Sequence, residues 1–148
     1  MYEGLFRHGE NEGEGIVASY RRIDDGLDLR LIEDSKLEIL EQNEESLKAR
    51  WHVWDGALNS IGTCQGMIHF GMADVIAAIL CDREGIVVTK DAGCFYHKPL
   101  YEGDVEVEAF IGKNGKSNIT AEVLFYQKGV LAFQSIFTMH ATTKTYSK

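Results

Sequence analysis

The most apolar run of the chain spans residues 65–81 and reads QGMIHFGMADVIAAILC. Its apolar residues do not fall on a single stripe, and it contains no proline, which is typical of a helix buried on nearly all sides. With about 17 residues it lies at the lower limit for a membrane span, and it carries His69 and Asp74 near its middle. We therefore predict the central helix of a soluble domain, in which Asp74 needs a partner or a site because a buried carboxylate is costly.

Apolar and polar residues alternate on the N-terminal side of this run, as they do in half-buried strands. The segments with this pattern are residues 27–31, 37–39 and 47–53. Turn-forming residues lie at 24–26, and the polar stretch at 41–45 predicts a hairpin connection. We therefore expect three strands ahead of the helix.

The chain beyond the helix also predicts strands. Residues 82–85 are expected to end the helix, with Gly85 as its cap. Asn114 and Gly115 predict a hairpin turn with positive φ, and residues 128–129 predict a second turn. The segments expected as strands are residues 86–96, 105–109, 119–125 and 130–141, the last of them in a central position.

Together these elements predict an α+β fold, in which a curved antiparallel sheet wraps round one long central helix. Residues 1–15 are rich in Gly, Glu and Asn and are expected to form a flexible N-terminal segment. Residues 16–148 are expected to form a single domain, which opens with a short strand or helical turn at residues 16–20.

The composition is that of an acidic globular protein. The chain has 148 residues, of which 45% are hydrophobic and 26% are charged, and its formal net charge is -8 at pH 7. This charge argues against a nucleic-acid partner, which would need a basic surface. The cysteines Cys64, Cys81 and Cys94 form no CxxC pair, and no signal peptide is recognised. We therefore expect a reduced, cytoplasmic protein without a nucleic-acid or membrane partner.

Several short motifs follow one another along the chain at defined spacings. Asn59 precedes residues 65–67 (QGM) by six positions, and residues 72–74 (MAD) follow. Residues 88–91 (VTKD) and 98–99 (KP) come next. This pattern resembles the hot-dog superfamily of acyl-CoA thioesterases, especially its phenylacetate-pathway branch. That branch shows an Asn, a His-Gly-Gly, a Leu-Ala-Asp or Leu-Ala-Glu, and then a Val-Thr-x-Asp strand that ends in Arg-Pro.

The chain departs from that family pattern at two positions. Gln65 stands where the family has His, and Met67 stands where it has the second Gly. The chain is also similar to the ligand domain of a bacterial malonyl-CoA-sensing repressor of the same fold, which has lost the catalytic carboxylate. This chain keeps Asp74 but shows no helix-turn-helix ahead of the domain. A binding protein is therefore the alternative to an enzyme.

The resemblance assigns catalytic roles to four residues. Asp74 would act as general base or nucleophile, and the N–H of Gly66 at a helix N-terminus would stabilise the oxyanion. Asn59 would hold the attacking water, or it would simply form an Asx turn in its loop. Gln65 would donate a hydrogen bond where the family uses His, but it cannot carry a proton. In the family the carboxylate faces the glycine of a partner subunit, so a homodimer or a dimer of dimers is expected.

Four further residues are candidates for substrate binding. Thr89 would support the carboxylate across the subunit interface, or it is an ordinary strand residue. His69 lies nearly one turn past Gly66 and is either near the substrate or a satisfied core histidine. Phe70 would line an acyl pocket, and Lys98 would contact the phosphates of coenzyme A. No metal site is expected, because His69 has no second ligand at a suitable spacing.

The sequence therefore predicts an acyl-CoA thioesterase whose site lies at a dimer interface. No cofactor is expected beyond the coenzyme A of the ligand. A non-catalytic acyl-CoA sensor is the main alternative, because of Gln65 and Met67. An acyl-chain dehydratase of the same fold is less favoured, since its His and carboxylate pair cannot be placed here.

Overall fold

The structure is a computed structural model and describes residues 20–83, 85–142 and 146–147. Its helices and strands, in chain order, are β1 (Tyr20–Arg21), α1 (Leu27–Asp34), β2 (Glu38–Gln42), β3 (Ser46–Val53), the 3-10 turn η3 (Asp55–Ala57), α2 (Gly66–Leu80), β4 (Val87–Tyr96), β5 (Gly103–Asn114), β6 (Asn118–Gln127), β7 (Val130–Ala141) and β8 (Tyr146–Ser147). The expectations for residues 1–15 and 16–19 lie outside the described residues.

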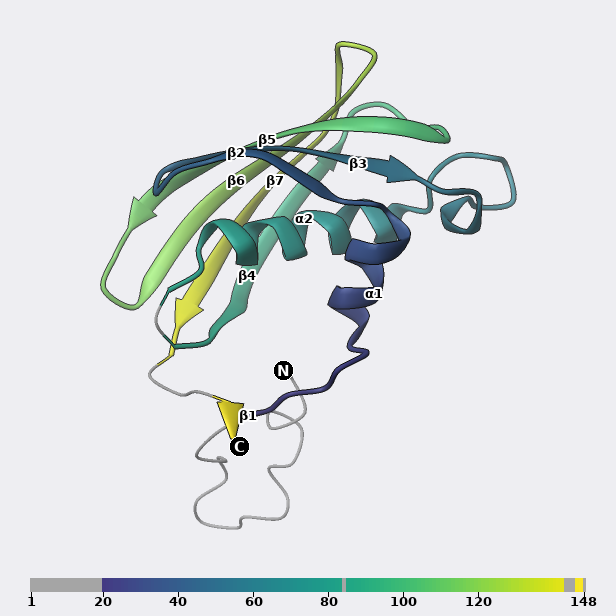
Figure 1. The fold of residues 1–148 in the computed structure, drawn as a ribbon. Helices are drawn as coiled ribbons and strands as arrows, with labels where there is room; N and C mark the ends of the chain where they lie inside the picture. The colour runs from purple at the N-terminus through teal and green to yellow at the C-terminus, as the bar shows by residue number, and fades with distance from the viewer. Residues whose placement is uncertain (1–19, 84, 143–145, 148) are drawn as a thin grey trace.

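Six strands form one antiparallel sheet in the order β2-β3-β5-β6-β7-β4. The sheet curves around α2, which lies along its concave face, and α1 packs beside α2 (Figure 1). This arrangement confirms the predicted fold of a curved sheet around a central helix. It also confirms an interior position for the strand β7, which lies between β6 and β4. The short strands β1 and β8 form a separate parallel pair.

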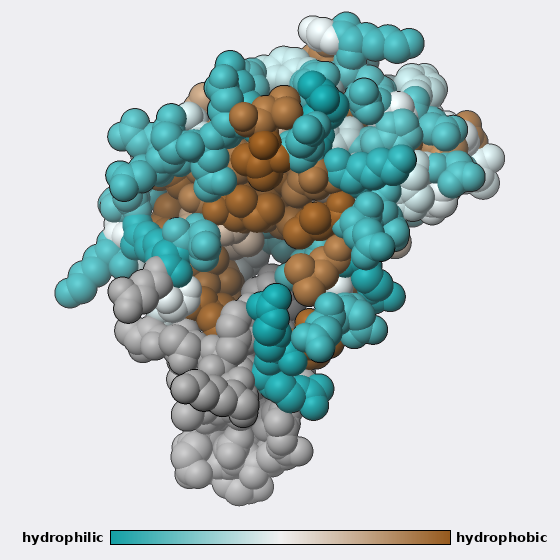
Figure 2. Space-filling model, viewed as in Figure 1, coloured by the Kyte–Doolittle hydropathy of each residue, from teal (hydrophilic) through white to brown (hydrophobic). Residues whose placement is uncertain are grey.

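The central helix α2 is confirmed almost to the residue. It buries its apolar side chains against a core that includes the fully buried Trp51, Phe125, Phe133 and Phe137. On the side that the sheet leaves open, apolar surface gathers between the sheet and α1 (Figure 2). The predicted cap was wrong, because the helix ends at Leu80 with Cys81 as its C-cap. Gly85 does adopt positive φ, but it does so in the connection to β4.

The strand predicted over residues 27–31 is wrong, because this segment lies in the helix α1. The leucines that alternate there also include an i, i+4 pair, and a pattern of five residues cannot separate the two periods. The carbonyl of Gly26 accepts the first helical bond from the N–H of Arg30 at 3.0 Å. Leu31 packs toward α2, where its side chain would lie 3.4 Å from a Cβ placed on Gly71.

The predicted hairpins form, with differences in detail. Lys128 and Gly129 both have positive φ, of 51° and 78°, as a two-residue hairpin turn requires. Neither Asn114 nor Gly115 has positive φ, so that expectation was wrong. The strand β5 continues through Asn114, and the turn closes with the N–H of Gly115 on the carbonyl of Asn118 at 2.9 Å. The strand β2 is exposed along its whole length rather than half-buried.

Candidate active site

Asp74 lies half-buried on α2 and accepts a short hydrogen bond from the hydroxyl of Thr89 on β4. Burial raises the pKa of the Asp74 carboxyl, the Thr89 hydrogen bond opposes this rise, and the charge of Asp28 on α1 adds to it. Thr89 was expected to reach the carboxylate across a subunit interface, but it belongs to the same chain. The strand β4 runs beside α2 and brings Thr89 to Asp74 directly. Each chain therefore carries a complete carboxylate–hydroxyl pair.

Gly66 is the first residue of α2, so its N–H has no acceptor within the helix. The helix dipole makes this position favourable for negative charge. A Cβ on Gly66 would have the Tyr96 hydroxyl as its nearest contact, at 3.6 Å, so the glycine leaves room for close approach. That same hydroxyl donates to the Gly66 carbonyl at 2.8 Å. The N–H remains available as a donor toward an oxyanion.

The two ends of this arrangement are far apart within one chain. Gly66 and Asp74 are separated by eight residues of α2, which is about 12 Å along a helix axis. A thioester carbonyl bound at the Gly66 N–H therefore cannot also be attacked by Asp74 of the same chain.

The ring of His69 contacts the backbone carbonyl of Gln65 at the start of α2. Gln65 is the N-cap of the helix, and its exposed side chain makes no capping hydrogen bond. Its carbonyl lies 3.2 Å from Nδ1 of His69, which is only 2% exposed. Nε2 of His69 is buried and has no partner among the described residues. The structure thus places His69 in the core, with only one of its two ring nitrogens satisfied.

Asn59 forms the Asx turn that was its alternative role. Its Oδ1 accepts from the N–H groups of Ile61 at 3.1 Å and Thr63 at 3.0 Å. Its Nδ2 donates to the hydroxyl of Thr63 at 2.9 Å. The side chain therefore shapes its own loop ahead of α2, and its role in holding a water stays a prediction.

The remaining two candidates are Phe70, on α2, and Lys98, in the connection between β4 and β5. Phe70 is half-buried, and its ring packs against Phe137 with a centroid distance of 5.3 Å. Lys98 is exposed and lines a hollow of about 720 Å³ together with Lys128. The same hollow is lined by the carboxylates of Glu102, Asp104 and Glu106. A phosphate role for Lys98 therefore stays a prediction.

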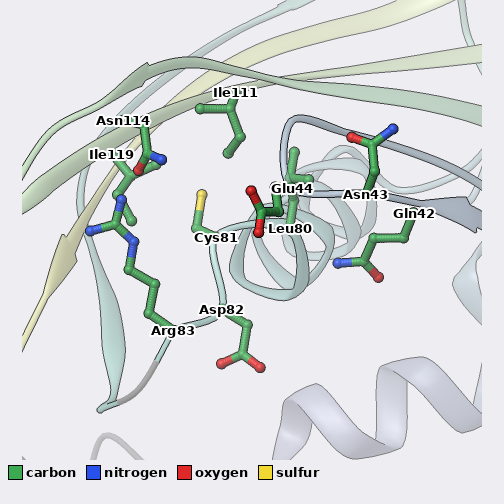
Figure 3. Close-up of a pocket in the computed structure, with 10 residues that line it drawn as sticks. All are labelled: Gln42, Asn43, Glu44, Leu80, Cys81, Asp82, Arg83, Ile111, Asn114 and Ile119. Atoms are coloured by element: carbon green, nitrogen blue, oxygen red, sulfur yellow. The ribbon is translucent and has the colours of Figure 1, made fainter.

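A second hollow lies at the other end of α2. It has a volume of about 550 Å³ and is lined by Gln42, Asn43, Glu44, Leu80, Cys81, Asp82, Arg83, Ile111, Asn114 and Ile119 (Figure 3). Arg83 is held there by the carbonyl of Gly115 at 3.1 Å. None of the predicted site residues lines this hollow, so we place the candidate reaction at the Gly66 end and along the flank of α2.

Sequence reasoning assigned no catalytic role to Tyr96 or Asp28. Tyr96 lies on the same face of β4 as Cys94, because the two alternate with Phe95. The effect of Asp28 on the pKa of Asp74 was not predicted, because residues 27–31 were assigned to a strand and not to the helix α1. Within the described ranges, no group of three or more His, Cys, Asp or Glu residues is placed to hold a metal ion. In the same ranges, no helix is long and apolar enough to cross a membrane.

A curved antiparallel sheet wrapped round one long central helix is the hot-dog fold. Residues 66–132 match the model of the thioesterase superfamily. No curated protein matches the chain. The family match confirms the resemblance stated from the sequence, and it supports a thioester hydrolase as the class of enzyme.

Solved structures show the same fold at low sequence identity. The PaaI protein of the Escherichia coli phenylacetic acid degradation operon is 18% identical with a TM-score of 0.73, over 80% of this chain and 88% of that chain. A hypothetical thioesterase from Streptococcus pneumoniae TIGR4, solved with coenzyme A, is 18% identical with a TM-score of 0.68, over 77% and 98%. The protein smu.793 from Streptococcus mutans UA159, bound to acetyl-CoA, is 18% identical with a TM-score of 0.69, over 84% and 94%.

Proposed function

We propose that the protein hydrolyses acyl-CoA thioesters at a site shared by two copies of the chain, with no metal or cofactor beyond the coenzyme A of the substrate. The observation that carries this proposal is the half-buried Asp74 carboxylate, which is held by the Thr89 hydroxyl and whose pKa is raised by burial. A carboxylate with a raised pKa is a stronger base. The coenzyme A and acetyl-CoA bound to two structural neighbours support the choice of ligand.

The chemistry follows from the two groups. The thioester carbonyl oxygen accepts a hydrogen bond from the Gly66 N–H of one copy. The Asp74 carboxylate of the other copy removes a proton from a water, whose oxygen attacks the thioester carbon. The tetrahedral intermediate collapses with cleavage of the C–S bond. The coenzyme A sulfur leaves and takes up the proton, so that a free acid and a thiol are the products.

The strand β4 is the edge that would join the two copies. It lies at one end of the six-stranded order, and Lys90, Asp91 and Ala92 on it are exposed. An open edge of this length needs cover, and antiparallel pairing of two β4 strands across a two-fold axis would extend the sheet. Because Thr89 lies on β4 and binds Asp74, this pairing would bring each carboxylate close to the second chain.

A binding function without turnover is the second candidate. It is favoured by Gln65, which cannot carry a proton, and by Met67, which is 72% exposed beside Gly66. In this case the same site would hold the acyl-CoA without positioning a water for attack. The two functions share a ligand and differ in turnover.

The test is thiol release measured over acetyl-CoA, octanoyl-CoA and phenylacetyl-CoA, together with calorimetric binding of the same ligands. We expect at least one of them to be hydrolysed with thiol and acid formed in equal amounts. Binding without thiol release would establish the sensor function instead. Light scattering on the same sample should show a dimer or a tetramer, and a monomer at micromolar concentration would remove the shared site.

A further inference from the structure

We propose that His69 is a positioning residue for the oxyanion donor, through a hydrogen bond from its Nδ1–H to the carbonyl of Gln65. The inference rests on the proposed function and adds a residue to it. The carbonyl of Gln65 and the N–H of Gly66 belong to the same planar peptide group. A donor that fixes this carbonyl therefore fixes the direction in which the Gly66 N–H points.

The Gln65 carbonyl has contacts with side chains as well as with a backbone N–H. It accepts from the N–H of Ile68 at 2.9 Å and lies 3.2 Å from Nδ1 of His69. The thiol of Cys64 adds a weaker contact at 3.6 Å. Hydrogen bonds to a carbonyl polarise its peptide group, so they also make the N–H on the other side a stronger donor.

The ring of His69 is fixed in this position by aromatic neighbours. Its centroid lies 5.1 Å from that of Tyr96 in an edge arrangement and 5.4 Å from that of Phe133. The hydroxyl of Tyr96 in turn donates to the Gly66 carbonyl at 2.8 Å, which fixes the next peptide group and the N–H of Met67. Two successive N–H groups at the start of α2 are thus oriented by side chains that bind the carbonyls of the same peptides.

The chemistry of the carbonyl defines the tautomer of His69. A carbonyl oxygen only accepts, so Nδ1 must carry the proton. Nε2 is buried without a partner among the described residues, and a proton on it would be an unsatisfied donor. Burial lowers the pKa of the His69 ring, in keeping with a neutral imidazole. His69 therefore acts as a fixed neutral donor and not as a proton carrier.

Two substitutions separate positioning from packing. His69→Phe keeps an aromatic ring but removes the donor, whereas His69→Asn loses ring volume but keeps an N–H near the position of Nδ1. Positioning predicts that His69→Phe lowers kcat by about 10-fold or more with KM nearly unchanged, and that His69→Asn retains most of kcat. A merely structural role predicts the reverse order, since Phe fills the core better than Asn. That reverse order, corrected for folded protein, would overturn the proposal.

A second readout does not depend on turnover. In the Asp74→Asn background, acetyl-CoA labelled with ¹³C at the thioester carbonyl is bound, and its carbonyl stretch is recorded by infrared difference spectroscopy. A strong donor at Gly66 should lower this frequency, and His69→Phe should remove part of the shift while His69→Asn keeps it. An unchanged shift in His69→Phe contradicts the role of His69. If wild-type turnover is absent but the shift responds as expected, the proposed hydrolysis fails and the positioning role stands.

Discussion

The backbone groups at the two ends of α2 differ in their hydrogen bonds. At its C-terminal end, the N–H of Cys81 binds the carbonyl of Ala77 at 2.9 Å, and Gln42 donates to the carbonyl of Ile79 at 3.4 Å. At its N-terminal end, the side chains of His69 and Tyr96 bind carbonyls, and no side chain caps the amides. The C-terminal end thus has bonded carbonyls at Ala77 and Ile79, whereas the N-terminal end has N–H groups without a side-chain cap. Under the proposed function, these N–H groups are the ones that bind the developing oxyanion.

The largest effect on kcat is expected from substitution of the Asp74 carboxylate. Asp74→Asn keeps the shape and can still accept the Thr89 hydrogen bond, but it cannot act as a base. Loss of a positioned base should lower kcat in thiol release by about 100-fold or more, with acyl-CoA affinity retained. Asp82→Asn, at the C-terminal end of α2, is the matched control and should stay within about twofold of wild type. Comparable turnover in folded Asp74→Asn would shift the assignment to the binding function.

A smaller effect is expected at the residue that supports the carboxylate. Thr89→Val removes the hydroxyl that donates to Asp74, and we expect kcat to fall by about 10-fold, at the low end for a group in acid–base catalysis. Because this hydrogen bond lowers the pKa of Asp74, its loss should also move the acid limb of the pH–rate profile to higher pH. Thr89→Ser keeps the hydroxyl, so kcat and the position of the acid limb should both be close to those of the wild type. A profile that does not move in Thr89→Val would show that the bond has no effect on the base.

The raised pKa of Asp74 also predicts how stability depends on pH. A carboxyl whose pKa is higher in the folded than in the unfolded state favours folding when protonated, and this contribution is lost as the pH rises through the folded pKa. Asp74→Asn should therefore raise Tm relative to wild type at neutral pH, and the difference should vanish below the ordinary aspartate pKa. Thermal unfolding from pH 3 to pH 8 measures this. A Tm difference between Asp74→Asn and wild type that does not change with pH would mean that burial does not raise the pKa of Asp74.

The smallest effect is expected at the C-terminal end of α2. Arg83→Ala removes the hydrogen bond to the Gly115 carbonyl, which ties the end of α2 to the turn between β5 and β6. We expect a loss of about 1 kcal/mol in the free energy of unfolding and unchanged kcat per folded protein. Arg83→Lys is the conservative control in a denaturant titration. A fall in kcat would break the distinction between the two ends.

The elements that the sequence predicted correctly are those with long or unambiguous patterns. The 15 residues of α2 and the 12 residues of β7 are long, mostly apolar runs, and their length and apolarity were enough to predict an element and its burial. The helix α1 was mistaken for a strand because five residues do not distinguish a period of 2 from a period of 3.6. The turn at Lys128 and Gly129 was found from local residue preferences alone, which is where such preferences are strongest.

The structure joins two of the predicted site residues, while the catalytic and binding roles of all of them stay predictions. Asp74, selected by its spacing, accepts a hydrogen bond from Thr89, the residue predicted to support it. The sequence could not tell that Thr89 reaches Asp74 within one chain, because this depends on how β4 packs against α2. It also could not show that His69 binds the Gln65 carbonyl, since a buried histidine leaves the same pattern whether or not it supports a site.

The placement of Asp74 and Thr89 on one chain, about 12 Å along α2 from Gly66, has a genetic consequence under the proposed shared site. Each chain would contribute its base to one site and its oxyanion donor to the other. A mixed dimer of an Asp74→Asn chain with a His69→Phe chain would collect both defects in one site and leave the second site intact. Two impaired alleles would then complement each other, which alleles of an enzyme with self-contained sites cannot do.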